Sequence, residues 1–239
     1  MNKRYAFTDI HGNYKLLKKV LEYCDKNDEI YFLGDAADRG LQGLECIESL
    51  LNDIRVKYLI GNHEKMFLDS YIEFKRQEEG IEEIDFYNSS LLLWISNSGD
   101  KTWYPFLEKY NQEQRKIFLE KIKSLPKTIN FTNKNGKLLL LSHSGCSYPS
   151  NLSMEDVIWN REHLSQKYWE DKDNIYIVHG HTPTVSHYFN KSISKPEIVQ
   201  YCDNHKIDID MGTYVTNCIA LLDLDSIGDK ELSVVYFYD

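Results

Sequence analysis

Five short polar blocks in the sequence contain side chains that could bind metal ions. Each block combines aspartate, histidine or asparagine with glycine, and each directly follows a short apolar run. In chain order, the blocks are Asp9-Ile10-His11-Gly12, Gly34-Asp35-Ala36-Ala37-Asp38-Arg39-Gly40, Gly61-Asn62-His63-Glu64, His143-Ser144-Gly145 and His179-Gly180-His181-Thr182-Pro183. Carboxylates, imidazoles and amide oxygens are common protein ligands of divalent cations, and glycine allows tight turns close to a ligand. One block alone would carry little weight, but five blocks in one chain indicate a metal-centred site.

The apolar runs before the first three blocks predict neighbouring strands of a parallel sheet. These runs cover residues 5–7, 30–33 and 56–60. Between them, aliphatic residues recur at helical spacing over residues 16–21 and 44–51, which predicts two crossover helices. Crossover helices join parallel strands, and ligands of open α/β sheets bind at the carboxyl ends of the strands. We therefore expect the polar blocks to meet at one edge of the sheet.

The middle of the chain predicts a helical insertion. Residues 64–125 are helical in pattern and strongly charged, and Pro126 ends the last helix. We predict a single domain over residues 1–239 with a helical cap-like insertion at about 65–135. We expect its aromatic side chains to form a core, and these are Tyr71, Phe74, Phe86, Tyr87, Trp94, Trp103 and Tyr104.

The second half of the chain predicts a further sheet that is richer in antiparallel pairing. Asn135-Gly136 lies between apolar runs at residues 128–131 and 137–141, and Asn-Gly in this setting indicates a hairpin. Further strands are predicted over residues 174–178, 206–210, 217–224 and 231–238, the last two joined by a turn at Gly228-Asp229.

Composition excludes several classes of protein. The chain has 28 lysines and arginines and 37 acidic residues. The resulting net charge of −9 argues against non-specific binding to nucleic acid or to an anionic membrane. There is no run of about 18 apolar residues, and the beginning of the chain turns polar too early for a secretory signal. The five cysteines are odd in number and lack CxxC spacing. We expect a cytoplasmic protein with reduced, buried thiols.

Taken together, the five blocks resemble the sequence pattern of the calcineurin-like metallophosphoesterases. Within that superfamily the chain is similar to the phosphoprotein phosphatase (PPP) family, especially its bacterial and lambda-phage-like serine/threonine protein phosphatases. The resemblance spans residues 9–182. It implies an α/β (α+β) fold, namely an αββα sandwich of two mixed β-sheets flanked by helices.

The same resemblance implies two divalent metal ions, with Mn²⁺ expected and Fe or Zn²⁺ as alternatives. Two cations that share a carboxylate lower the pKa of a water molecule bound between them, so that it becomes hydroxide. They also hold the phosphoryl oxygens during in-line displacement. The ligands that the resemblance implies are Asp9 and His11 for the first ion, Asn62, His143 and His181 for the second, and Asp35 as the bridge between them.

The remaining roles concern proton donation and contact with the phosphoryl group. His63 is the expected general acid, and the family pairs it with Asp38. Arg39 carries a planar guanidinium suited to bidentate contact with phosphoryl oxygens, to which Asn62 should also be close. Arg161 lies in a Trp-x-Arg segment that resembles the one supplying a second arginine in lambda-phage-like members.

Other polar residues are expected to support the site or to lie outside it. The segment Asp208-Ile209-Asp210-Met211-Gly212 is similar to a late Asp-x-Gly turn of the family, which we expect to support the site by packing. For His179 we expect a structural role rather than metal ligation. His163, His187 and His205 match no block, and we expect them at the surface.

The expected activity is hydrolysis of phosphoprotein Ser/Thr phosphate by in-line attack of a metal-bridging hydroxide, with Tyr phosphate as a possible further substrate. A symmetric dinucleoside polyphosphate hydrolase is an alternative, although that group typically replaces the aspartate found here as Asp38. A non-catalytic metal-binding scaffold is a third reading, but such proteins usually lose a ligand or the acid. Related nucleases and phosphodiesterases carry a histidine where this chain has Pro183.

Overall fold

The computed structural model describes residues 2–81, 88–150, 152–169, 175–189 and 195–239. Its centre is a five-stranded sheet in the order β10-β9-β1-β2-β3. The predicted parallel strands are confirmed as β1 (Arg4–Phe7), β2 (Glu29–Phe32) and β3 (Val56–Tyr58). Two strands that we expected in the second sheet, β9 (Cys218–Asp223) and β10 (Val234–Tyr238), instead complete this sheet, because β9 pairs antiparallel with β1 and β10 with β9. The first sheet is therefore mixed.

A second mixed sheet of five strands has the order β4-β5-β6-β8-β7. The predicted hairpin is confirmed, because β4 (Thr128–Thr132) pairs antiparallel with β5 (Leu138–Ser142). Two parallel pairings follow, to β6 (Ile175–His179) and then to β8 (Lys206–Asp208). The edge strand β7 (Val199–Tyr201) was not predicted, because three residues with a central glutamine give no apolar pattern. Residue 174, included in a predicted strand, lies outside the described residues.

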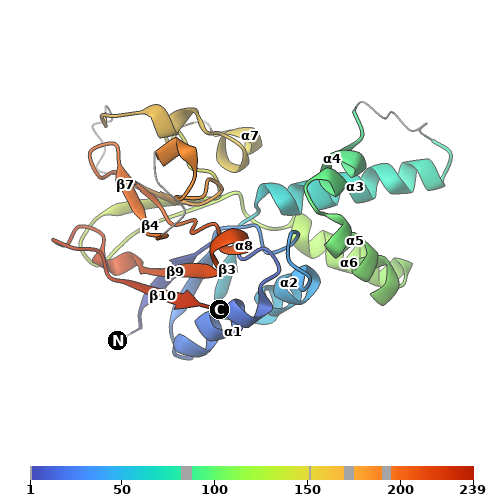
Figure 1. The fold of residues 1–239 in the computed structure, drawn as a ribbon, viewed down its shortest axis with the longest axis horizontal. Helices are drawn as coiled ribbons and strands as arrows, with labels where there is room; N and C mark the ends of the chain where they lie inside the picture. The colour runs from blue at the N-terminus through green and yellow to red at the C-terminus, as the bar shows by residue number, and fades with distance from the viewer. Residues whose placement is uncertain (1, 82–87, 151, 170–174, 190–194) are drawn as a thin grey trace.

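The two sheets pack face to face, and helices cover their outer faces (Figure 1). Strand alternation explains this packing, since successive side chains point to opposite faces of a sheet. Ala6 of β1 joins Leu141 and Val178 in the core between the sheets. Its neighbour Phe7 faces the other way and packs with Leu17 of α1 (Tyr14–Tyr23); α2 (Gly43–Asn52) lies on the same face. The predicted sandwich of two mixed sheets flanked by helices is confirmed.

The helices between β3 and β4 extend to one side of the two sheets (Figure 1). They are α3 (Asn62–Glu78), α4 (Ser90–Ser96), α5 (Asp100–Lys109) and α6 (Gln112–Lys123). The helical part therefore begins slightly before the expected residue 65 and ends at Lys123, since residues 128–135 belong to β4 and the hairpin turn. The division into one domain with an insertion stays a prediction.

A group of aromatic rings fills the space between these helices. Trp94 and Trp103 are buried, whereas Tyr104, which we expected in this core, is 66% exposed. Tyr71 and Phe74 pack against the buried cluster. Two further residues of the expected core, Phe86 and Tyr87, lie outside the described residues.

Short elements complete the chain. They are α7 (Met154–Ile158), η1 (Glu162–Ser165), η2 (His187–Phe189), α8 (Thr213–Thr216) and η3 (Leu224–Ser226). Among the helices that the structure describes, none is long and apolar enough to cross a membrane.

Candidate metal centre

The six expected metal ligands come together at the carboxyl ends of strands from both sheets. Backbone hydrogen bonds tie the loops that carry them, as between His11 N and Asp35 O at 3.1 Å and between Gly180 N and His143 O at 2.7 Å. All six side chains are buried. The residues gathered here are Asp9, His11, Asp35, Asn62, His143 and His181.

Asp35 occupies the middle of this cluster. Its Oδ2 atom lies 3.8 Å from Nε2 of His11 and 3.4 Å from Nε2 of His143. Two groups of side chains have ligand atoms within 4.8 Å of one another, and Asp35 belongs to both. A carboxylate common to two such groups is what a bridging ligand requires.

One of these two groups contains the expected ligands, and the other differs from the expected set by one residue. One contains Asp35 with His143 and His181, as expected, while the other joins Asp35 and His11 to His63 rather than to Asp9. Asp9 nevertheless lies beside this second group, because its Oδ1 atom is 3.6 Å from Nε2 of His11.

Hydrogen bonds orient two imidazoles for metal binding. Nδ1 of His11 donates to the carbonyl of Ala37 at 3.0 Å, and Nδ1 of His143 donates to the carbonyl of Leu33 at 2.8 Å. A histidine that binds a metal usually donates its other ring N–H in this way. Nε2 of each ring is thereby directed to the centre, so the residues present fit a metal site.

Donor atoms for the second ion are equally close together. Oδ1 of Asn62 lies 2.8 Å from Nε2 of His143 and 2.9 Å from Nδ1 of His181. This set of one amide oxygen and two imidazole nitrogens, completed by the Asp35 carboxylate, suits Mn²⁺, Fe or Zn²⁺.

The charged side chains of the cluster shift one another's pKa values. Burial by itself would raise the pKa of Asp35, but the nearby His143 and His63 hold it well below its usual range. Burial would lower the pKa of His143, yet the carboxylates of Asp35 and Asp9 raise it to about 9. Ionised carboxylates in a buried cluster attract positive charge, which protons or metal ions can supply.

Backbone strain is concentrated in the same loops. Four of the six expected ligands have left-handed φ values, which are 52° for Asp9, 44° for His11, 63° for Asp35 and 70° for His181. Non-glycine residues adopt this conformation at a cost, and such strain clusters at functional sites. The tight turns aim the side chains into the centre.

His63 and Asp38 form a buried pair beside the cluster. Nδ1 of His63 lies 2.6 Å from Oδ2 of Asp38, and both side chains have zero exposure. Burial would lower the pKa of His63, but the carboxylates of Asp35 and Asp38 raise it above its ordinary value. The ring therefore keeps its proton more readily than a free histidine does.

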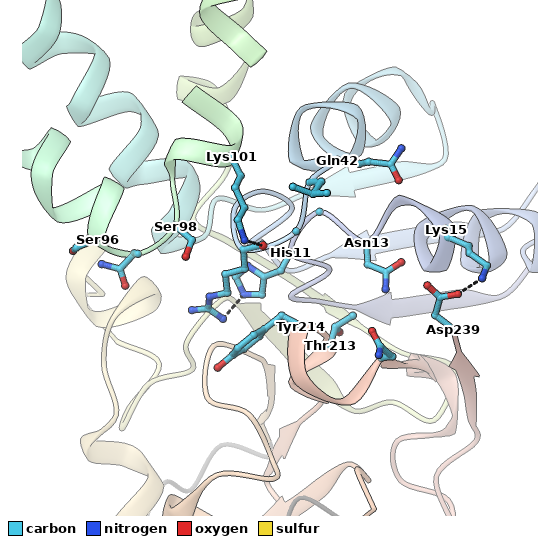
Figure 2. Close-up of a pocket in the computed structure, with 16 residues that line it drawn as sticks. His11, Asn13, Lys15, Gln42, Ser96, Ser98, Lys101, Thr213, Tyr214 and Asp239 are labelled. Atoms are coloured by element: carbon cyan, nitrogen blue, oxygen red, sulfur yellow. Dashed lines mark hydrogen bonds and ion pairs between the residues drawn. The ribbon is translucent and has the colours of Figure 1, made fainter. Parts of the chain in front are cut away.

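Arg39 lies over the mouth of the centre. Its guanidinium donates to Nε2 of His11 at 2.8 Å, lies 3.2 Å from Nε2 of His63 and packs 4.4 Å above the ring of Tyr214. An open pocket begins here. Figure 2 shows Lys101 of α5 and Tyr214 of α8 on opposite sides of His11 in this pocket. A phosphoryl group entering by this side would meet the cation of Arg39 first.

Arg161 is the second arginine that the resemblance implies. It precedes η1, and its guanidinium is 6.0 Å from the ring centroid of Tyr188. The pKa of His181 is well below its ordinary value because of burial and then of the charges on His143 and Arg161. The charge of Arg161 therefore reaches the metal centre, although the described contacts place it against an aromatic ring.

Four further histidines outside the ligand set occupy different environments. Nε2 of His179 is 2.7 Å from the hydroxyl of Tyr201 and its Nδ1 is 3.1 Å from the carbonyl of Gly180. The prediction that His163 lies at the surface was wrong. It is 1% exposed, because Ser144 O and the hydroxyl of Tyr201 hold its ring nitrogens inside the fold. His187 is exposed, whereas His205 is half-buried.

Sequence reasoning gave no role to Glu64, which fixes two of the site's loops. Its carboxylate accepts from the backbone N–H groups of Asp35, Ala36 and Gly61, each at 2.9 Å, and from the hydroxyl of Tyr58 at 2.7 Å. Its place within the third polar block was a signal that it belongs to the site. Lys101 and Tyr214 were also missed, and they lie in segments without any motif.

The two-sheet sandwich with a buried Asp/His/Asn centre at its strand ends is the arrangement of a metal-dependent hydrolase. Residues 3–211 match the family of calcineurin-like phosphoesterases, and the chain belongs to this family. Members depend on a dinuclear metal site. The protein is accordingly a hydrolase of the phosphatase type.

Named relatives point to more than one substrate. The serine/threonine-protein phosphatase 1 of Salmonella typhimurium is 26% identical over 185 residues, which are 73% of this chain and 76% of that relative. A symmetrical bis(5′-nucleosyl)-tetraphosphatase of Buchnera aphidicola is 33% identical over 79 residues, covering 31% of this chain and 29% of that relative. The structure of a protein serine/threonine phosphatase from Saccharomyces cerevisiae has a TM-score of 0.61 at 16% identity, covering 100% of this chain and 80% of that one. This last likeness concerns the fold.

Proposed function

We propose that this protein is a phosphomonoesterase that hydrolyses phosphoserine and phosphothreonine in proteins. The observation that carries the proposal is the buried pair of His63 and Asp38 beside the candidate centre. Nε2 of His63 lies 3.8 Å from Oδ2 of Asp35, so the imidazole borders the place where a phosphate would react. A serine alkoxide is a strongly basic leaving group, and its release benefits from a positioned proton donor.

The six clustered side chains are the proposed metal ligands. Asp9 and His11 would hold one ion, Asn62, His143 and His181 the other, and Asp35 both. Two bound divalent cations supply Lewis-acid stabilisation of the phosphoryl oxygens and lower the pKa of water. We propose Mn²⁺ as the native ion, because carboxylate and amide oxygens, which come from three of the six ligands, suit it.

His63 is the proposed general acid. Its Nδ1–H donates to Asp38, which fixes the ring and leaves Nε2 between Asp35 and Arg39, where the phosphate would bind. The raised pKa of His63 keeps the proton available near neutral pH. Asp38 therefore acts by orienting the imidazole and by stabilising its charged form.

Arg39 and Arg161 are the proposed phosphoryl contacts, together with the amide of Asn62. Arg39 is already directed to the centre by His11 and by the ring of Tyr214. A guanidinium can donate two parallel hydrogen bonds to phosphoryl oxygens, which orients the phosphate for attack.

A symmetric dinucleoside polyphosphate hydrolase is the second candidate. The similarity to a bis(5′-nucleosyl)-tetraphosphatase supports it, although the matching segment is short. The intact Asp38 with its hydrogen bond to His63 favours the phosphatase.

A comparison of substrates tests these two candidates. We would measure kcat/KM for a phosphoserine peptide, a phosphotyrosine peptide and diadenosine tetraphosphate with added Mn²⁺. We expect the phosphoserine peptide to exceed diadenosine tetraphosphate, since kcat/KM measures discrimination between substrates. The reverse order would support the hydrolase of dinucleotides. No turnover of any substrate by the metal-loaded protein would support a non-catalytic scaffold.

We also propose that the protein acts in the cytoplasm. All five cysteines are buried and none forms a disulfide, which fits a reducing compartment. The proposed partner is a phosphoprotein or phosphopeptide, and the net charge of −9 does not favour nucleic acid or an anionic membrane.

A further inference from the structure

Two residues of the helical segment between β3 and β4 hold the carboxylate of Asp38. The indole N–H of Trp94, on α4, donates to Oδ2 of Asp38 at 2.5 Å. The hydroxyl of Thr102, on α5, donates to Oδ1 at 2.6 Å. All three side chains have zero exposure. Since His63 also uses Oδ2, the carboxylate that orients His63 is itself oriented by α4 and α5.

The backbone of the same loop is held by the same segment. Thr102 accepts the N–H of Asp38 at 3.1 Å through Oγ1, and Lys101 donates to the carbonyl of Arg39 at 2.5 Å. Asp38 and Arg39 have φ values of 67° and 63°. Two consecutive non-glycine residues in the left-handed region are costly, so these contacts offset strain in the loop.

Trp94 has little freedom to move away from Asp38. Its ring stacks on Phe67 at 4.8 Å and meets Trp103 edge to face at 5.8 Å. A Cβ atom at position 99 would come within 2.5 Å of the indole, so only glycine fits against it. The position of the Trp94 N–H is therefore set by the packing of the helices.

We propose that Trp94 and Thr102 are positioning residues for the proton donor, so that the helical segment takes part in catalysis through Asp38. Each carboxylate oxygen of Asp38 has a neutral donor from this segment, and the two hydrogen bonds fix the plane of the carboxylate relative to the imidazole. Without these donors His63 keeps its partner but loses a defined orientation. The inference rests on the proposed role of His63 in a phosphomonoesterase.

Two conservative substitutions remove the donors and keep the shape. Thr102→Val removes the hydroxyl, while Thr102→Ser retains it and serves as the rescue. Trp94→Phe keeps a ring against Phe67 but has no N–H. Trp103→Phe is the matched control, because it removes an indole from the same cluster but leaves the Trp94 donor in place and keeps an aromatic ring beside Trp94, where Trp103 lies at 5.8 Å.

The first readout is the dependence on the leaving group. With a phosphoserine peptide, Thr102→Val and Trp94→Phe should each lower kcat on the order of tenfold, a part of the 10²–10⁴-fold that a positioned acid supplies. With p-nitrophenyl phosphate, whose leaving group hardly needs a proton, kcat should change little. KM and metal content should stay constant, Thr102→Ser should restore kcat, and Trp103→Phe should not show this split. Equal losses on both substrates at full metal content, or no rescue by serine, would overturn the proposal.

The second readout needs no substrate. In the Zn²⁺-loaded protein, the Nδ1–H proton of His63 should give a downfield proton NMR signal that is absent from His63→Asn. Thr102→Val and Trp94→Phe should shift this signal, whereas Trp103→Phe should leave it in place. An unshifted signal in both variants would overturn the positioning role.

The two readouts also separate this inference from the proposed function. If wild-type protein fails to hydrolyse phosphoserine while the signal shifts, the proposed substrate is wrong and the positioning role stands. If Trp94→Phe does not fold, the Thr102 variants decide the question.

Discussion

Gly180 lies directly against Asp9 at the metal centre. A Cβ atom at position 180 would be 2.3 Å from Oδ2 of Asp9, closer than any real contact. The same oxygen accepts the backbone N–H of His181 at 3.1 Å. Glycine at this position therefore lets the loops of two proposed ligands, one from each sheet, approach each other.

Gly180→Ala should displace Asp9 and reduce metal binding. We expect loss of most bound metal and activity, measured by elemental analysis and by turnover of p-nitrophenyl phosphate. Gly80→Ala is the control, since Gly80 has a φ of +69° and no neighbour within 4 Å. It should cost about 1–2 kcal/mol of stability through backbone strain alone. Normal metal content in Gly180→Ala would show that Asp9 is not a ligand.

Asp35→Asn should remove the proposed bridge. The amide keeps the shape of the carboxylate but has neither its charge nor its two equivalent oxygens, so we expect metal occupancy and nearly all turnover to be lost. Asp53→Asn serves as control, because Asp53 pairs with Arg55 at 2.6 Å outside the cluster. Two bound metals with near-normal activity in Asp35→Asn would contradict the bridging role.

The polar blocks made the proposed ligand cluster predictable from sequence, because a strand fixes where its following loop begins. The carboxyl ends of β1, β2 and β3 meet at one edge, so the convergence of Asp9, Asp35 and Asn62 follows from the order of strands and helices. The hairpin at Asn135-Gly136 was predictable from local pattern in the same way, whereas the sandwich of two sheets was implied by the resemblance to the family.

The contacts made by side chains far apart in sequence were not predictable. Trp94 and Thr102 reach Asp38 from 56 and 64 residues away, and their sequence neighbourhoods read as ordinary helix. His163 was wrongly placed at the surface, since its burial depends on Tyr201 of β7, a strand too short to predict. Such pairings depend on tertiary packing rather than on local pattern.

Arg161→Ala should lower kcat/KM for phosphoserine peptide about tenfold or more, as expected for loss of a charged hydrogen bond in the transition state. Arg39→Ala should have at least as large an effect, because Arg39 is directed to His11. Lys123→Ala, at an exposed site on α6, should leave kcat/KM unchanged. An unchanged value for Arg161→Ala would assign that residue to the protein surface.

His163 should make stability depend on pH. Burial, and then the charge of Lys206, lower its pKa from 6.5 to about 4 in the folded protein. Between pH 6.5 and about 4 the unfolded chain therefore binds a proton that the folded protein does not, so this contribution to stability is complete above pH 6.5 and is lost as pH falls.

His163→Gln should flatten that dependence. We would measure the free energy of unfolding by urea at pH 7 and pH 4.5 for wild type, His163→Gln and His187→Gln. The decrease on acidification should be smaller by up to about 3 kcal/mol in His163→Gln, and unchanged in the control at the exposed His187. An identical decrease in all three proteins would mean that His163 is charged in the fold.

The role of His63 as proton donor predicts an order among leaving groups. A serine alkoxide is a far stronger base than a tyrosine phenolate, whose conjugate acid has a pKa of about 10, and p-nitrophenolate is weaker still. His63→Asn should therefore reduce kcat most for phosphoserine, less for phosphotyrosine and least for p-nitrophenyl phosphate, within the roughly 10²–10⁴-fold range of a positioned acid.

Asp38→Asn should give the same order with smaller losses. The imidazole stays in place but loses the carboxylate at 2.6 Å, which orients the ring and stabilises its protonated form. The alternative is that His63 only supports its neighbour Asn62 and the Asp35 carboxylate, to whose Oδ1 its backbone N–H donates at 3.0 Å. Every substrate depends on those groups alike. Equal losses on all three substrates, with lower metal content by elemental analysis, would therefore assign His63 to the support of the metal centre rather than to proton transfer.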